Sequence, residues 1–501
     1  MKPASEPTLD ALAVTLTAAL ADDLRARGVP ERIASAFARV PRHRFLPDTV
    51  WTLDGDAIDR AADPDAWLRT AYSDQPLTTQ LDDGTTTDGR GSPSSSSSAP
   101  SVMARMLTAA RLEPGHRVLE VGTGTGYNAA ILSDLLGPAN VTTIEIDEEV
   151  AATARANLHA CGYRPTVLVG DGELASTPMA VYDRLMATCS VADLPWAWPD
   201  LIGGEGRIIT PWAPTPGAPA GALAVLEVER SEVRGRFEGG SSFMWARGQR
   251  RPNRPAPDAH ARPEHVTRTD TDPREPFLDG ETSLILSLLV GEWHYGMRME
   301  RGATEPHVWI GSTSDGSWAR LHADGRVEQA GVRRLHEEFT AALSRWRDRG
   351  EPPVDRFGLT FDRDHATRTL WSDSPADTLW SARWNRPTAH MRLRRRYFDL
   401  VVSGRKTVEV RVADDARERL RVGDALRFRC DGAEVATRIT GLTRYATFEE
   451  LLEHEPVAAI DPTTTREGLL GALREIYPPD REARGVLAIA IETVSRRTYE
   501  E

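Results

Sequence analysis

Cysteine and long hydrophobic runs are both scarce in this sequence. Only three cysteines occur among 501 residues, and Cys161, Cys189 and Cys430 are widely separated and lack metal-ligand spacing. This pattern excludes a disulfide framework and a zinc knuckle and is typical of a reducing compartment. No segment has about 18 consecutive apolar residues, which excludes a transmembrane helix. Residues 1–10 contain neither a basic start nor an apolar run, so we expect no signal peptide, a cytoplasmic protein and no membrane partner.

An excess of basic residues is also missing. The formal net charge is -13, which argues against non-specific binding of the whole chain to nucleic acid. The acidity is uneven, because basic and acidic residues are equal in number from residue 389 onward. The hydrophobic and charged fractions, 40% and 27%, are those of an ordinary globular protein, and the length predicts about two to four domains.

Short apolar segments alternate with helical ones in the first half of the chain. Apolar residues at helical spacing predict helices over residues 11–24 and 30–40, and Pro100 is well placed to begin another helix. Five later apolar runs predict strands, at residues 117–121, 141–146, 166–169, 184–187 and 207–210. Strands that alternate with helices predict a doubly wound, Rossmann-like α/β sheet with parallel strands and helices on both faces.

Breaks in composition divide the chain into four predicted domains. We expect an N-terminal helical region at residues 1–85, followed by the α/β domain at residues 86–215. Residues 220–385 predict a small accessory α+β domain, which contains a proline- and arginine-rich connector at residues 247–272. A compact C-terminal domain is expected at residues 389–501.

The segment VLEVGTGTGYNAA at residues 118–130 carries the strongest chemical signal. Its predicted strand leads into three alternating glycines, Gly122, Gly124 and Gly126. Glycines at such a turn let a ligand approach the backbone, and the start of the following helix offers free amides. A dinucleotide fingerprint would need a glycine at the position of Tyr127. Alternating glycines after a strand with Glu120 near its end instead suit the methionine moiety of S-adenosylmethionine.

Two later features complete a cofactor-binding pattern. Glu145 ends the next predicted strand, roughly 20 residues beyond the glycines, where a carboxylate can accept hydrogen bonds from both ribose hydroxyls. Gly170, Asp171 and Gly172 follow the third predicted strand. The glycine turn alone is weakly specific, but the three features together predict S-adenosylmethionine as the cofactor.

From residue 39 to about residue 212 the chain resembles the protein-L-isoaspartate O-methyltransferases. The matching pieces, in chain order, are VPRHRFLPD, AYSDQPL, VLEVGTGTGY, VTTIEID, GDG and YDRLMAT, which begin at residues 40, 71, 118, 141, 170 and 182. The resemblance implies a doubly wound fold and S-adenosylmethionine as the methyl donor. It also implies methylation of the carboxylate of an isoaspartyl or aspartyl residue.

The resemblance implies a set of cofactor-binding residues. These are Glu120, Gly122, Thr123, Gly124, Gly126, Tyr127, Glu145, Ile146, Asp171 and Gly172. Within the set, the glycine loop matches the methionine side, Glu145 the ribose-binding acid, and Asp171 with Gly172 the adenine side. No metal is expected, because an ionised carboxylate is already a nucleophile and needs only alignment with the sulfonium methyl group away from water. The methyl ester can then lose methanol to a backbone nitrogen and form a succinimide.

The main departure from the family lies before the helix at Pro100. The family usually has Thr-x-Ser-Gln-Pro here, with the serine on the acceptor pocket, whereas this chain has SSSAP at residues 96–100. The resemblance implies Ser98 as the catalytic-site residue that contacts the acceptor. The alternative is a flexible serine linker, since residues 82–98 are polar and predict a loop. Cys189 is expected to be a packing residue, because the sequence offers no partner that would stabilise a thiolate.

Two substrates stay open. Repair enzymes of the family are usually little more than the catalytic domain, whereas longer forms resemble methyltransferases that tailor ribosomally made peptides. Residues 225–384, with the motif FGLTFD at residues 357–362, resemble the appended domain of those longer forms. We therefore weigh an aspartate of a ribosomally made peptide against damaged residues of proteins at large, and favour the first.

The C-terminal domain resembles the ASCH domain, a small β-barrel related to PUA folds. The resemblance depends on SGRKTVEVR at residues 403–411 and on RVGD at residues 421–424. Members bind RNA or nucleotides, so the candidates for a phosphate or base site are Arg394, Arg405, Lys406 and Arg411. Some members hydrolyse acetylated cytidine with a lysine, a threonine and a glutamate. Glu409 stands at the threonine position here, so hydrolysis is not expected.

The C-terminal domain leaves a second function class open. In this alternative the chain is mainly an RNA- or nucleotide-binding protein whose methyltransferase-like domain acts as a sensor. The intact cofactor motifs around Gly122, Glu145 and Asp171 favour the methyltransferase.

Overall fold

The computed structural model describes residues 6–86, 91–173, 177, 181–229, 231–250, 257–258, 261–299, 304–384, 389–414, 417, 420, 424–430 and 433–493. The chain divides into two compact units, one built from Met1–Leu194 and Trp198–Trp384 and the other from Pro195–Ala197 and Asn385–Glu501. None of the described helices is both long enough and apolar enough to cross a bilayer.

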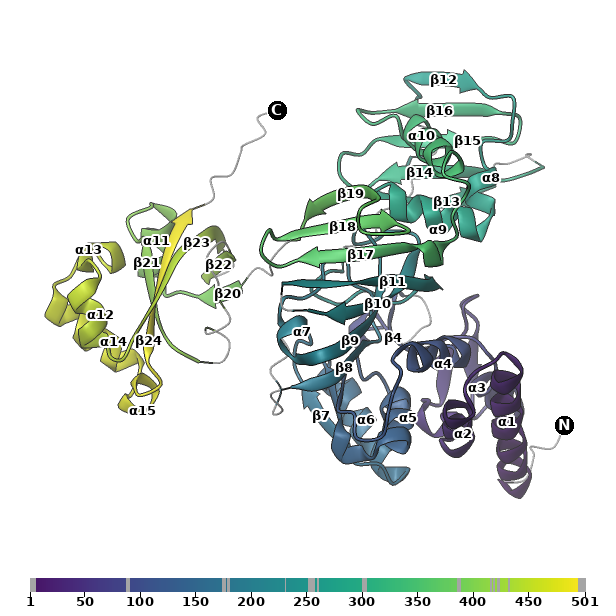
Figure 1. The fold of residues 1–501 in the computed structure, drawn as a ribbon, viewed down its shortest axis with the longest axis horizontal. Coiled ribbons are helices and arrows are strands. Elements are labelled where there is room, and N and C mark those ends of the chain that lie inside the picture. The colour runs from purple at the N-terminus through teal and green to yellow at the C-terminus, as the bar shows by residue number, and fades with distance from the viewer. Residues whose placement is uncertain are drawn as a thin grey trace. The chain divides into compact units, whose positions relative to one another are not determined.

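A ten-stranded sheet forms the centre of the first unit (Figure 1). Its strand order is β19-β18-β17-β11-β10-β9-β8-β5-β6-β7. The parallel half contains β5 (Val118–Val121), β6 (Val141–Glu145), β7 (Thr166–Val169), β8 (Tyr182–Ala187) and β9 (Ile202–Trp212). These are the five strands that the sequence predicted, and their parallel pairing confirms the doubly wound Rossmann-like sheet. All four residues of β5 are buried, as expected for a strand covered on both faces.

The helices of this half follow the strands in the predicted order. They are α4 (Pro100–Ala109), α5 (Tyr127–Leu136), α6 (Glu148–Ala160) and α7 (Ala197–Asp200), with a short 3-10 turn, η3 (Pro138–Asn140). Pro100 begins α4 as predicted, because proline at the first helical position removes only an amide that no helical carbonyl would accept. The Asp147 side chain caps α6 by accepting hydrogen bonds from the amides of Glu149 and Val150.

The N-terminal region contains a sheet in addition to the predicted helices. The helices are α1 (Glu6–Ala26), α2 (Glu31–Arg39), η1 (Arg42–Phe45), α3 (Pro64–Ala71) and η2 (Asp82–Gly84). The sheet has the order β2-β1-β3-β4 and consists of β1 (Thr49–Trp51), β2 (Ala57–Asp59), β3 (Leu77–Leu81) and β4 (Pro93–Ser97). The predicted loop over residues 82–98 is therefore wrong at its end. Antiparallel pairing of Leu77 with Ser97 satisfies the backbone of the serine run, and this tertiary pairing outweighs the weak strand preference of the run.

The accessory region contributes strands to the same ten-stranded sheet. These are β10 (Gly221–Val228), β11 (Glu232–Ser241), β17 (Phe357–Asp362), β18 (Thr367–Ser372) and β19 (Thr378–Arg383). The domain boundary expected between residues 215 and 220 stays a prediction, and β9 and β10 on its two sides are hydrogen bonded to each other.

The accessory region also forms a second, five-stranded antiparallel sheet of order β12-β16-β15-β14-β13. Its strands are β12 (His265–Arg268), β13 (Trp293–Arg298), β14 (His307–Ser312), β15 (Trp318–Leu321) and β16 (Arg326–Ala330). The helical segments of the region are α8 (Glu275–Leu278), α9 (Gly280–Leu289), α10 (Leu335–Arg347) and η4 (Val354–Arg356). A core that includes Trp293, Ile310 and Phe339 joins this sheet to α10. The predicted connector at residues 247–272 is wrong in part, since residues 265–268 are strand β12.

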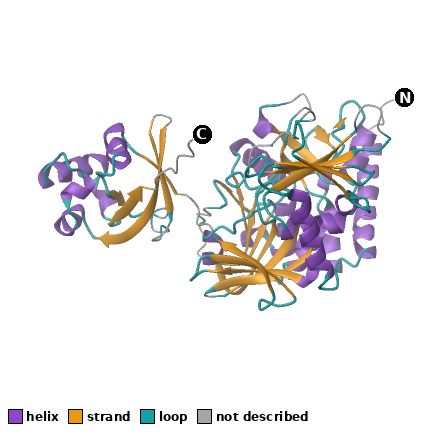
Figure 2. Cartoon of the chain, turned by 90° about the horizontal axis from the view of Figure 1, so that it is seen from above, coloured by secondary structure: helices purple, strands orange, loops and turns teal. Residues whose placement is uncertain are grey.

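The second unit has a curled, half-barrel sheet of order β20-β22-β23-β24-β21, in agreement with the predicted ASCH-like barrel. The strands are β20 (Ala389–Arg392), β21 (Val408–Val412), β22 (Ala425–Cys430), β23 (Ala433–Tyr445) and β24 (Val486–Thr493). The helices are α11 (Arg395–Val402), α12 (Phe448–His454), α13 (Val457–Ile460), α14 (Arg466–Ile476) and α15 (Pro479–Glu482). Within this unit, most of the helices gather on one side of the sheet (Figure 2).

Candidate active site

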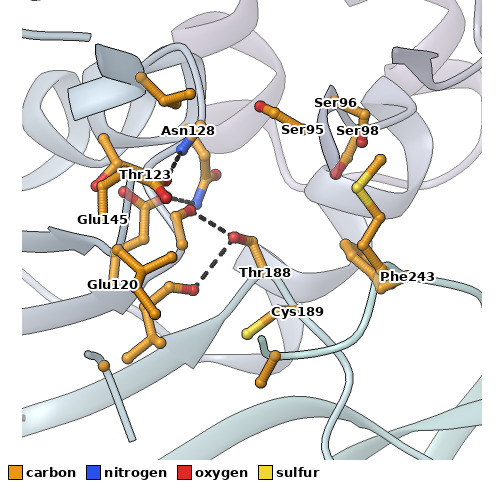
Figure 3. Close-up of a pocket in the computed structure, with 18 of the residues that line it drawn as sticks. Ser95, Ser96, Ser98, Glu120, Thr123, Asn128, Glu145, Thr188, Cys189 and Phe243 are labelled. Atoms are coloured by element: carbon orange, nitrogen blue, oxygen red, sulfur yellow. Dashed lines mark hydrogen bonds between the residues drawn. The ribbon is translucent and has the colours of Figure 1, made fainter. Parts of the chain in front are cut away.

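A pocket lies at the carboxyl ends of the parallel strands. Segments that directly follow β5, β6, β7 and β8 line it, as expected for a ligand site in a doubly wound sheet. The segment of residues 94–98 and the segment of residues 243–247 complete the lining. In Figure 3 the side chains of Ser95, Ser96 and Ser98 lie across the pocket from Glu120 and Glu145.

The pocket brings together almost all of the predicted site residues. Ser98 lines it, as do Glu120, Gly122, Thr123, Gly124, Tyr127, Glu145, Ile146, Asp171 and Gly172. Gly126 is the exception, because it caps α5 with a φ of 96° and faces α6. A Cβ atom at Gly126 would lie 3.2 Å from Leu158 Cγ and 3.3 Å from the Ala154 carbonyl oxygen, so this glycine permits close packing of the two helices.

The glycine turn after β5 is shaped for close approach of a ligand. Gly122 has a φ of 93°, and a Cβ atom there would lie 2.5 Å from Thr188 Oγ1, so no larger residue fits. The Gly124 amide donates a hydrogen bond to Glu145 Oε2 over 2.9 Å, which ties the turn to the end of β6. Gly172 is similarly restricted, since a Cβ atom would lie 2.4 Å from Val121 Cγ1.

Two buried carboxylates differ in how the protein satisfies them. Glu120 is fully buried and accepts hydrogen bonds from Asn128 Nδ2 at 2.7 Å and Thr143 Oγ1 at 2.6 Å. Burial raises the pKa of Glu120 to about 7, and its two neighbours only partly oppose the shift. Among the described residues, the hydrogen bonds to Glu145 come from backbone amides, including those of Gly124 and Asp147. Burial raises the pKa of Glu145 as well, while the Gly124 amide lowers it.

The residues around the glycine turn fit S-adenosylmethionine. Asn128 Oδ1 lines the pocket, is buried, and has no hydrogen-bond partner within the part of the chain that the structure describes. A buried acceptor of this kind is costly unless a ligand satisfies it, and an ammonium group would do so. Gly122 and Gly172, which exclude a side chain, leave space for the cofactor beside the backbone. Glu145 has lone pairs left over from its backbone hydrogen bonds and can accept from the ribose hydroxyls.

Thr188 and Cys189 follow β8 and form the floor of the pocket. Thr188 Oγ1 donates a hydrogen bond to the carbonyl oxygen of Gly122, which links the turns after β8 and β5. Desolvation and the nearby carboxylates raise the pKa of the Cys189 thiol far above its usual range. Cys189 is therefore a neutral thiol at physiological pH and not an activated nucleophile.

The sequence did not place residues 243–247 in the site. They follow β11 and bring Phe243, Met244 and Trp245 to the pocket, more than 100 residues after the glycine turn. Arg247 holds this segment in place through ion pairs with Asp147 at 2.9 Å and Asp83 at 3.3 Å. No local motif marks these residues, and only the position of β11 beside β10 brings them here.

Comparison with known proteins identifies the family. The family model described as Protein-L-isoaspartate(D-aspartate) O-methyltransferase matches residues 16–218. A protein-L-isoaspartate O-methyltransferase of Methanopyrus kandleri is 35% identical over 216 residues, which cover 42% of this chain and 82% of that one. A second, of Gloeobacter violaceus, is 34% identical over 192 residues, covering 38% and 78% of the two chains. This chain belongs to the protein-L-isoaspartate O-methyltransferase family.

As a member of that family, the chain is an S-adenosylmethionine-dependent methyltransferase of this type. A solved protein-L-isoaspartate O-methyltransferase aligns with a TM-score of 0.41 and 20% identity, covering 71% of this chain and 99% of that one. Another, from Plasmodium falciparum in complex with S-adenosyl-L-homocysteine, aligns with a TM-score of 0.35 and 16% identity, covering 46% and 98%.

The methyltransferase carries an ASCH domain as its second unit, since the ASCH family model matches residues 391–495. The structure corrects the predicted phosphate site there. Lys406 is buried, and its ammonium group donates to the carbonyl oxygens of Val408 and Ile460 and pairs with Glu409 at 3.1 Å. Arg411 pairs with the other oxygen of Glu409 at 3.0 Å. Both charges are neutralised inside the unit, so of the predicted cations Arg405 and Arg394 remain exposed.

Proposed function

We propose that this methyltransferase transfers a methyl group from S-adenosylmethionine to the carboxylate of an isoaspartyl or aspartyl residue in a peptide or protein. One observation carries the proposal: a hydroxyl-bearing segment, residues 94–98, faces the cofactor-side residues across a single pocket (Figure 3). Within the part of the chain that the structure describes, the Ser98 hydroxyl has no hydrogen-bond partner, so it is available to an acceptor oxygen.

The proposed roles of the residues follow from their positions. We assign Glu145 to the ribose hydroxyls, because within the described part of the chain it accepts from backbone amides alone, which leaves lone pairs for a further donor. Asn128 and the turn at Gly122 and Gly124 face the methionine moiety, and Asp171 with Gly172 faces the adenine. Ser98 orients the acceptor carboxylate.

The chemistry requires alignment more than activation. When bound, the cofactor supplies an electrophilic methyl group on a sulfonium. A carboxylate is ionised at neutral pH and needs no general base, so the chain contributes orientation and exclusion of water. Met103 and Met106 of α4, together with Phe243 and Trp245, provide apolar surface around the acceptor end. No proton has to be moved before transfer.

The accessory region supports a peptide substrate in preference to general repair. It extends the catalytic sheet by five strands and supplies residues 243–247 to the pocket, so it is part of the site. We propose that it selects an aspartate-containing, ribosomally made peptide, and that the methyl ester closes to a succinimide.

The test is mass spectrometry of an aspartyl and an isoaspartyl peptide incubated with S-adenosylmethionine. We expect a gain of about 14 Da, followed by a species about 18 Da below the starting mass as methanol is lost to a backbone nitrogen. The matched control replaces the acceptor residue by asparagine and should show no gain. A methyl group on an amine or hydroxyl, stable to mild base, would contradict the proposal.

A second activity is favoured by the arrangement of arginines in the ASCH unit. Arg392 of β20 pairs in register with Arg429 of β22, and Arg427 lies two residues away on the same exposed face. We propose that this face binds RNA or a nucleotide. Replacing Arg427 and Arg429 by Glu should abolish retention of a single-stranded RNA on a filter, and the binding of the parent should weaken steeply with salt. The buried Lys406 is the control: Lys406→Met should leave binding intact in a folded protein.

A further inference from the structure

Arg42, the first of the two arginines in the VPRHRF motif, is a buried cation beside the acceptor side of the pocket. It begins η1, and none of its side chain reaches solvent. Its guanidinium donates a hydrogen bond to Ser97 Oγ with a donor–acceptor distance of 3.2 Å. It also donates to five carbonyl oxygens, each at a donor–acceptor distance of 3.0 Å: those of Ala71, Ser73, Gln75, Ser97 and Ser98. All of these acceptors are neutral.

No carboxylate compensates this charge directly. Among the described residues, no ion pair includes Arg42, and Asp74, the carboxylate that acts on it through space, is engaged with Arg27 and the Ser101 amide. Burial lowers the pKa of Arg42 to about 10, so the group is still charged at neutral pH. A buried cation without a counter-ion is costly, and such a group beside a pocket is a candidate functional residue.

The position of Arg42 relative to the pocket indicates where that negative group binds. Ser97 and Ser98 line the pocket, and their carbonyl oxygens turn away toward Arg42. In a trans peptide the N–H group points opposite to the C=O group, so the Ser98 and Ala99 amides point away from Arg42. Arg42 therefore lies on one side of the Ser97–Ser98 backbone and the Ser98 and Ala99 amides point to the other side.

The pocket needs such a charge if its acceptor is an anion. Four acids line it, Glu120, Glu145, Asp171 and Glu173. Within the described part of the chain, its one basic lining residue is Arg247, which is committed to Asp147 and Asp83. Glu145 and Asp171, with whatever fraction of Glu120 and Glu173 is ionised, oppose a carboxylate acceptor, and apart from the cofactor's own sulfonium no described lining residue offsets them.

We propose that Arg42 is a positioning residue that makes the acceptor end of the pocket selective for an anion: it fixes the Ser97–Ser98 backbone and supplies the positive field that a carboxylate acceptor requires. This inference rests on the proposed carboxyl methylation, because only an anionic acceptor benefits from the buried charge.

The experiment compares an isoaspartyl peptide with the same peptide carrying a side-chain carboxamide, both titrated calorimetrically into protein loaded with S-adenosyl-L-homocysteine. In the parent protein we expect the carboxylate peptide to bind better. In Arg42→Gln we expect its affinity to fall about 10-fold or more, while the carboxamide peptide changes less than about 2-fold. Arg42→Lys loses most of the guanidinium's hydrogen bonds to the backbone but keeps the charge, and it should retain most of the preference for the carboxylate.

Each outcome separates the two hypotheses. A parent protein that does not prefer the carboxylate overturns the proposed function itself. If the parent prefers the carboxylate peptide and Arg42→Gln keeps that preference, the role of Arg42 alone is overturned. The same holds if Arg42→Gln loses affinity equally for both peptides, because that result indicates only that the Ser97–Ser98 backbone has moved. S-adenosyl-L-homocysteine affinity reports folding of each variant. If Arg42→Gln does not bind it, Arg42→Lys decides, since loss of the carboxylate preference in that folded variant contradicts the electrostatic role.

Discussion

Gln249 Nε2 donates a hydrogen bond to Glu173 Oε1 over 2.7 Å, which connects the segment after β11 to the turn after β7. The same nitrogen donates to the Asp193 carbonyl oxygen at 2.8 Å. Gln249 Oε1 accepts from the amides of Ala192 and Asp193 at 2.8 and 3.0 Å. One amide side chain thus uses its donors and acceptors to hold three segments around the cofactor end of the pocket.

Gln249→Glu should weaken cofactor binding in a pH-dependent way. Burial, helped by Asp171 and Asp193, raises the pKa of Glu173 to about 7. A second carboxylate beside it repels the ionised form, so we expect S-adenosylmethionine affinity to fall by roughly 1 kcal/mol near pH 8.5 and to recover near pH 6, where the pair shares a proton. Calorimetry at both pH values checks this. The double variant Glu173→Gln with Gln249→Glu should recover part of the loss, and a pH-independent loss would contradict this account.

Glu145→Ala should weaken S-adenosylmethionine binding by about 1 to 3 kcal/mol, because the ribose hydroxyls lose a charged acceptor. Titration calorimetry of the folded variant measures the change. Glu145→Gln is the control, since it keeps one acceptor oxygen and should lose less. Unchanged affinity in Glu145→Ala would remove Glu145 from the cofactor site.

Ser98→Ala should raise KM for the acceptor peptide by about 5-fold, the loss of one ordinary hydrogen bond, and leave the S-adenosylmethionine affinity unchanged. Ser94→Ala is the matched control in the same run of serines. The Ser94 hydroxyl is already engaged, donating to Gln80 Oε1 at 2.8 Å and accepting from the Asp83 amide. Equal effects of the two variants on KM would show that Ser98 has no special contact with the acceptor.

Glu120 should make the cofactor-free protein less stable as the pH rises. The folded protein holds the Glu120 proton up to a pKa of about 7, against a reference of 4.5, so between these values the folded state binds more protons than the unfolded state. The free energy of unfolding therefore decreases with rising pH, by up to about 3 kcal/mol from this group. Urea unfolding at pH 5 and pH 8 measures it, and Glu120→Gln should remove this part of the slope. A variant with the parent's full pH dependence would show that Glu120 is ionised throughout.

Contiguous motifs determined the parallel half of the fold and the cofactor side of the pocket. The cofactor motif consists of a buried strand, the glycine turn that follows it and an acid at the end of the next strand. These parts are close in sequence, and parallel strands bring their carboxyl ends together at one edge of the sheet. The positions of Gly122, Glu145 and Asp171 could therefore be predicted before the structure was known. Their grouping in one pocket agrees with that prediction, whereas their contacts with the cofactor stay predictions until they are tested.

The acceptor side was decided by tertiary structure. The serine run became β4 only because Leu77 and its neighbours on β3 offered a pairing partner, and no local propensity of serine indicates a strand. Residues 243–247 reach the pocket because β11 continues the catalytic sheet, a pairing between distant segments that composition does not encode. The burial of Lys406 against Glu409 has the same origin: sequence shows the charges, but whether a cation faces solvent or a buried carboxylate depends on which surfaces the fold brings together.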